Sequence, residues 1–88
     1  MIFDNDSTIS QIVARCASRA DDAIQIHGVF ASCHEGYAVI LEELDELWDE
    51  VKKKKRDRDP QRIREECIDI AAAAIKMATQ AQMEHEGK

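Results

Sequence analysis

The sequence predicts an all-α protein, a bundle of three main helices that forms a single domain over residues 1–88. Apolar residues recur at intervals of three and four along three segments, which is the spacing of an amphipathic helix. The composition includes only three glycines and one proline, and no run alternates between apolar and polar residues as a strand would. A chain of 88 residues has a marginal core, so we expect a homodimer or homotetramer, with dimerisation completing the bundle.

The first predicted helix runs from about Thr8 to His27. Thr8 and Gln11 match a capping box, and Gly28 is a typical stop signal. The apolar stripe of this helix comprises Ile9, Ile12, Val13, Cys16, Ala20, Ala23 and Ile24.

The second predicted helix begins near Cys33, because Ser32 and Glu35 form another capping box. Its apolar stripe comprises Tyr37, Ile40, Leu41, Leu44, Leu47, Trp48 and Val51. At about 100° per residue, the centre of this stripe falls near Leu44 and Val51. Acidic residues lie at the edge of the stripe (Glu43 and Glu50) and just beyond it (Glu46). Three more acidic residues are expected to point toward solvent: Glu42, Asp45 and Asp49. We expect the aromatic rings of Tyr37 and Trp48 to pack in the core or in a dimer contact rather than to stack on the base of a ligand.

Asp59 and Pro60 predict the start of the third helix, as N-cap and first-turn proline. It is expected to end at about Met83. Its predicted apolar face comprises Ile63, Cys67, Ile70, Ala71, Ala74, Ala78 and Ala81. Glu66 lies at the border of this face and Asp69 a little further round. An antiparallel hairpin of the second and third helices would therefore bring two acidic borders together.

Composition excludes several classes of function. The net charge of −6 argues against nucleic acid as the main partner, because phosphate binding requires a basic face. No stretch approaches the roughly 18 apolar residues of a membrane span. Three cysteines, an odd number, and no recognisable signal peptide predict a reduced, cytoplasmic protein.

The acidic borders suggest a divalent metal site. Glu43 and Glu46 on one helix, with Glu66 and Asp69 on the other, would present four carboxylates to a shared space. Mg²⁺ prefers such oxygen ligands and completes its octahedron with water and substrate phosphates. The alternative is a solvated acidic surface, which is common on helical proteins.

Two motifs carry a family resemblance. Glu42-Glu43-Leu44-Asp45-Glu46 matches EExxE, and Glu66-Cys67-Ile68-Asp69 matches ExxD, with a basic turn between them. Over roughly residues 34–78 the chain resembles the MazG-like all-α nucleoside triphosphate pyrophosphohydrolases, which include dimeric dUTPases and dCTPases. That family usually has a four-helix core, so a second copy would be expected to supply what three helices lack.

The resemblance implies Mg²⁺-dependent hydrolysis, with Mn²⁺ as a possible substitute, between the α- and β-phosphates of an NTP or dNTP. The products would be a nucleoside monophosphate and pyrophosphate, in a role that cleanses the nucleotide pool. By motif position, Glu43, Glu46, Glu66 and Asp69 are the expected metal ligands. Glu42 is the expected residue to hold or activate the attacking water, so the implied catalytic set is Glu42, Glu43 and Glu46.

Three basic residues are candidates for binding the substrate phosphates: Lys54, Arg62 and Lys76. Lys54 belongs to the basic run of residues 52–58, for which a solvated turn that complements a helix C-terminus is the favoured explanation. The rival function is a non-catalytic helical module that oligomerises or binds a partner protein.

Overall fold

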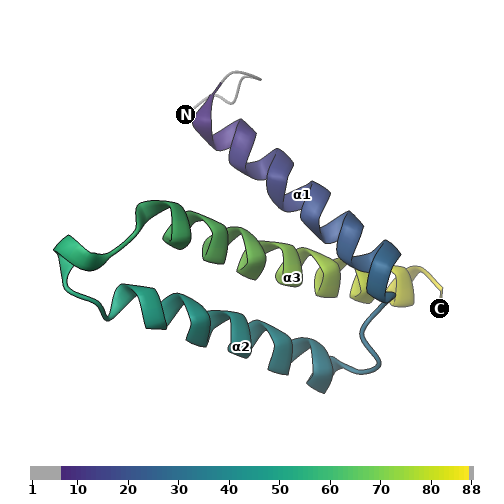
Figure 1. The fold of residues 1–88 in the computed structure, drawn as a ribbon. Coiled ribbons are helices and arrows are strands. Elements are labelled where there is room, and N and C mark those ends of the chain that lie inside the picture. The colour runs from purple at the N-terminus through teal and green to yellow at the C-terminus, as the bar shows by residue number, and fades with distance from the viewer. Residues whose placement is uncertain (1–6, 88) are drawn as a thin grey trace.

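The computed structural model describes residues 7–87, and this part of the chain is all-helical. It comprises α1 (Thr8–His27), α2 (Cys33–Val51), a short 3-10 helix η1 (Lys55–Asp57) and α3 (Pro60–Glu86). Helices α2 and α3 form an antiparallel hairpin, and α1 lies along the other side of α3 (Figure 1). The predicted three-helix organisation is therefore confirmed, with α3 as the central helix that contacts both others.

The ends of α1 depend on short-range hydrogen bonds. Ser7, not Thr8, is the N-cap: its Oγ accepts from the backbone N–H of Ser10 at 3.0 Å. The Thr8/Gln11 capping box was therefore wrong by one residue, although the helix does begin at Thr8. Gly28 closes the helix as predicted, with a φ of 72° that favours glycine and an N–H donating to Ile24 O at 2.8 Å.

The other two helix starts are confirmed. Ser32 Oγ accepts from Glu35 N–H at 3.1 Å, while Glu35 Oε1 accepts from the N–H of Ala31, just before the N-cap. Asp59 Oδ1 accepts from Gln61 N–H at 2.9 Å and caps α3. Helix α3 continues to Glu86, beyond the predicted end near Met83.

The buried apolar core is small and centres on the α1–α3 contact. It comprises Cys16, Ala20, Phe30, Ile68 and Ala72. The predicted apolar face of α3 was partly wrong, because Cys67, Ala74, Ala78 and Ala81 are exposed. The physical reason is that α3 packs on two sides, and neither side coincides with the row of small residues that periodicity selects.

The predicted centre of the α2 stripe, near Leu44 and Val51, was also wrong. The side that packs on α3 contains buried Gly36 and Glu50 and the half-buried residues Ile40, Glu43 and Leu47. A Cβ on Gly36 would lie 2.9 Å from Met77 Sδ and 3.0 Å from Phe30 Cδ2, so glycine permits this close approach.

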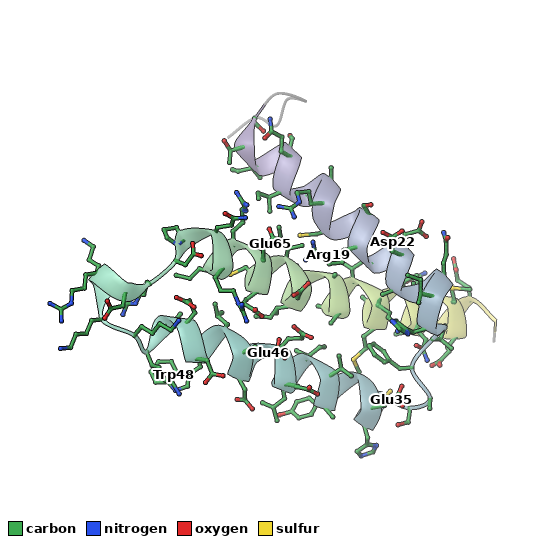
Figure 2. All side chains as sticks on the ribbon, viewed as in Figure 1. Arg19, Asp22, Glu35, Glu46, Trp48 and Glu65 are labelled. Carbon is green, nitrogen blue, oxygen red and sulfur yellow. The ribbon has the colours of Figure 1, made fainter. Side chains whose placement is uncertain are left out.

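A row of large apolar residues on α2 is left outside the protomer core. Tyr37, Leu41, Leu44 and Trp48 are 65%, 48%, 48% and 59% exposed, and their spacing places them on one side of the helix. Figure 2 shows Trp48 projecting from α2 away from α3. Within residues 7–87, none of the helices combines the length and the apolar character that crossing a bilayer demands.

Candidate metal centre

Three carboxylates meet where α2 packs on α3. Glu43 and Glu46 lie one turn apart on α2, and Glu66 projects from the facing turn of α3. One oxygen from each lies within 4.8 Å of the others. The structure thus brings together three of the four predicted ligands, because the i, i+3 spacing aligns two of them and the antiparallel hairpin adds the third.

Two oxygens of this acid cluster (Glu43, Glu46 and Glu66) are buried without a hydrogen-bond partner among residues 7–87. They are Glu43 Oε2 and Glu66 Oε2. Glu66 is only 5% exposed, and its other oxygen accepts from Arg62 Nε at 2.9 Å. A buried carboxylate oxygen without a donor is costly, and a cation at this position would satisfy both oxygens.

The environment of Glu43 disfavours its charged form. Burial raises the pKa of Glu43 to about 7, and repulsion from Glu46, Asp69 and Glu66 acts in the same direction. A divalent cation would reverse this effect, because it favours the ionised carboxylate. Without a cation, burial and the neighbouring carboxylates therefore both disfavour the charged form of Glu43.

Asp69, the fourth predicted ligand, lies outside the group of three. Its Oδ1 accepts from Arg19 Nη1 at 2.6 Å, and Arg19 Nη2 also donates to Glu65 Oε1 at 3.2 Å. Figure 2 shows Arg19 and Glu65 in the space between α1 and α3. Asp69 is nevertheless near enough to raise the pKa of Glu43, so it borders the acid cluster while it is paired with a cation of α1.

The remaining predicted site residues lie in different surroundings. Glu42 is exposed on α2 and does not belong to the acid cluster. Arg62 contacts the cluster through Glu66. Lys54 is exposed and is the N-cap of η1, at the turn between α2 and α3. In the same turn Arg58 Nε donates to Val51 O at 2.8 Å, as expected of a basic turn that complements a helix C-terminus.

Lys76 is buried, 7% exposed, and its Nζ lies 4.2 Å from the centroid of the Phe30 ring. A cation over an aromatic face is stabilised by the ring quadrupole. Lys76 therefore packs against Phe30 in the wall of the cavity that Glu43 also lines, instead of reaching solvent.

A cavity of about 440 Å³ adjoins the acid cluster. Residues of all three helices and of the link between α1 and α2 line it. They include Arg19, His27, Phe30, Val39, Glu43, Asp69 and Lys76. Apolar walls with a few converging charges, at this volume, are typical of small-molecule sites.

Sequence reasoning missed Arg19 and Phe30. Arg15 and Arg19 are four residues apart, as are Glu65 and Asp69, and this matched spacing is the signal that would have paired α1 with α3. Phe30 lies in an apolar link, which indicates packing. It is held by Gln80, whose Oε1 accepts from Phe30 N–H at 2.9 Å and whose Nε2 donates to Phe30 O at 2.8 Å.

Comparisons of the chain with known protein families, with curated proteins and with solved structures found no match. The interpretation of the centre therefore depends on its motifs and its geometry.

Proposed function

We propose that this protein is an Mg²⁺-dependent nucleoside triphosphate pyrophosphohydrolase of the MazG-like type. It would hydrolyse an NTP or dNTP between the α- and β-phosphates, releasing a nucleoside monophosphate and pyrophosphate. The observation that carries the proposal is the acid cluster, with two buried, unpartnered carboxylate oxygens at the edge of a cavity of nucleotide-compatible size.

The residues present suit a hard divalent cation. Glu43, Glu46 and Glu66 would hold it, and Asp69 would join them once released from Arg19. Carboxylates combined with water and phosphate oxygens are the ligand set of Mg²⁺, and Mn²⁺ accepts the same set. When bound, the metal polarises the phosphates and lowers the pKa of the attacking water.

The other residues of the centre bind and orient the substrate. Lys76, buried in the wall of the cavity that Glu43 also lines, would contact a phosphate oxygen, and Arg62, which pairs with Glu66, would do so from the outer edge. Glu42 and the exposed Glu46 would hold the attacking water. The apolar walls at Val39 and Phe30 would exclude solvent from the rest of the nucleotide. We assign a nucleotide-cleansing role in the cytoplasm, a reducing compartment that suits three free cysteines.

A pyrophosphate-release assay across a panel of NTPs and dNTPs, with and without Mg²⁺, tests this function. Glu43→Gln and Asp69→Asn should each lower turnover by roughly 100-fold or more, since a metal ligand is lost. Asp45→Asn, an exposed acid on the same helix, is the matched control and should retain activity. Unchanged turnover in both ligand variants would reject the site, and no hydrolysis of any nucleotide would reject the function.

A second copy of the chain would cover the exposed row on α2. The large side chains Tyr37, Leu41, Leu44 and Trp48 have a complement in a row of small residues on α3, which comprises Cys67, Ala71, Ala74 and Ala78. A two-fold axis would place the large row of each copy against the small row of the other. That pairing buries apolar surface that the small core of residues 7–87 leaves open, and it assembles a four-helix core.

The same exposed row supports the second candidate, a non-catalytic oligomerisation or partner-binding module. This alternative predicts self-association without hydrolysis, and no stabilisation by Mg²⁺ or Mn²⁺. Thermal unfolding with and without the metal therefore separates the two functions.

A further inference from the structure

Arg19 makes two ion pairs at the edge of the acid cluster. Nη1 lies 2.6 Å from Asp69 Oδ1 and Nη2 lies 3.2 Å from Glu65 Oε1. The same side chain lines the cavity together with Asp69, Glu43 and Lys76. One guanidinium is therefore in contact with an expected metal ligand and with the space proposed for the nucleotide.

These two contacts put Arg19 in competition with a cation for Asp69. Asp69 Oδ1 accepts a charge-assisted hydrogen bond at 2.6 Å, and this strong bond makes it a weaker ligand for a metal ion while Arg19 holds it. The positive charge of Arg19 also opposes the approach of a second cation to the cluster. A divalent ion that recruits Asp69 through Oδ1 must therefore displace the guanidinium.

A displaced Arg19 has a short path to a new partner. Glu65, which Arg15 and Arg64 also contact, provides a tether for Nη2 while Nη1 turns into the cavity. A planar guanidinium is suited to bidentate contact with a phosphate, more so than an ammonium group.

We propose that Arg19 is an exchangeable counter-ion that pairs with Asp69 when no metal is bound and contacts the substrate phosphates once Asp69 binds the metal. The inference rests on the proposed metal site. It makes the binding of metal and of nucleotide ordered, because the phosphate-binding form of Arg19 exists only after Asp69 has exchanged its partner.

Arg15 provides a matched control. It lies one turn before Arg19 on α1, its Nη2 is 2.8 Å from Glu65 Oε1, and its side chain is 41% exposed against 37% for Arg19. It does not line the cavity, so its removal takes away a similar ion pair without touching Asp69.

The test compares wild type, Arg19→Ala, Arg19→Lys and Arg15→Ala by calorimetric titration with Mn²⁺ in the absence of nucleotide. Arg19→Ala should tighten Mn²⁺ binding by roughly two- to fivefold, as expected for removal of a partly exposed competing ion pair. In steady-state assays it should raise KM for the nucleotide by about tenfold or more. Arg19→Lys should raise KM less than Arg19→Ala does. Arg15→Ala should change neither the Mn²⁺ affinity nor KM.

A merely structural Arg19 would lower the melting temperature without tightening Mn²⁺ binding, and that result would overturn the proposal. An unchanged KM in Arg19→Ala would also overturn the proposal. Pyrophosphate release by the wild type would still support the proposed function in that case. Absence of Mn²⁺ binding to the wild type would reject both. Arg19→Gln, which keeps length and hydrogen-bonding capacity, replaces the alanine variant should α1 detach in it.

Discussion

Glu43 and Glu66 face one another across the α2–α3 contact, and each keeps a buried Oε2 without a hydrogen-bond partner in residues 7–87. The hairpin around them is held by apolar packing and by helix caps at both ends. The carboxylates themselves repel one another. This local conflict between stability and charge is typical of a site that a ligand completes.

The conflict predicts that Glu43→Gln stabilises the metal-free protein at and above neutral pH. The pKa of Glu43 rises from 4.5 to about 7 on folding, so the folded state retains a proton that the unfolded chain loses. The contribution of Glu43 to stability is therefore fully present below pH 4.5 and is lost as the pH rises from 4.5 through 7. Glutamine removes this loss, and melting temperatures in EDTA should rise by roughly 4–8 °C per kcal/mol of relieved repulsion.

The control is Asp45→Asn, which removes a charge from the exposed side of the same helix. Its melting temperature should follow that of the wild type across the pH range. A Glu43→Gln variant less stable than wild type at pH 8 would contradict the repulsion described above.

Metal binding is expected to depend on pH through the same carboxyl. A divalent ion must displace the proton of Glu43, so affinity should increase up to about pH 7 and then level off. At 100 times the Kd the metal should add about 2.7 kcal/mol of stability. Differential scanning fluorimetry with Mg²⁺ or Mn²⁺ at pH 5.5 and pH 8 measures the difference, and Glu66→Gln should abolish the shift at both.

Attachment of α1 to α3 should be sensitive to acid. Hydrogen bonds from Arg15 lower the pKa of Glu65 to about 2, with Arg19 contributing further. The stabilisation is therefore fully present above pH 4.5 and is lost as the pH falls toward 2. Protection of the amide hydrogens of residues 8–27, measured relative to the intrinsic exchange rate at each pH, should decrease over this range in the wild type. In Glu65→Gln this protection should already be low at pH 5, while Glu84→Gln on the same helix should resemble the wild type.

The row of Tyr37, Leu41, Leu44 and Trp48 predicts an oligomer that one charge can dissociate. Leu44→Asp would place a carboxylate in the proposed apolar contact and should weaken self-association by roughly tenfold or more. Light scattering after size exclusion measures this. Ile26→Asp, at a 72% exposed position on α1, is the control and should leave the mass unchanged. A wild-type monomer at high concentration would contradict the dimer.

Local features of the fold were predictable because they depend on neighbours in the chain. Ser32 and Asp59 cap their helices through N–H groups three and two residues on, and Gly28 closes α1 through its own backbone. The N-cap of α1 shows the limit of such rules, because it is Ser7 and not the expected Thr8. Both residue types cap well, and only the backbone geometry distinguishes them.

The site was predictable only in part, for the same reason. Glu43 and Glu46 share a turn, so their proximity follows from helical spacing. The pairing of Arg19 with Asp69 joins residues 50 positions apart, and that of Lys76 with Phe30 joins two different elements. Neither pairing is visible until the helices are placed.

The amino-acid sequence by itself determined three helices, nearly all of their ends, and which acids share a helix surface, because these follow from hydrogen bonds and spacing within a few residues. The tertiary structure decided which side of α2 and α3 is buried. It thereby made Glu43 a half-buried acid with a raised pKa, paired Asp69 with Arg19 and left the large apolar row of α2 exposed. These outcomes depend on how a central helix divides its surface between two neighbours, and periodicity along one helix cannot specify that.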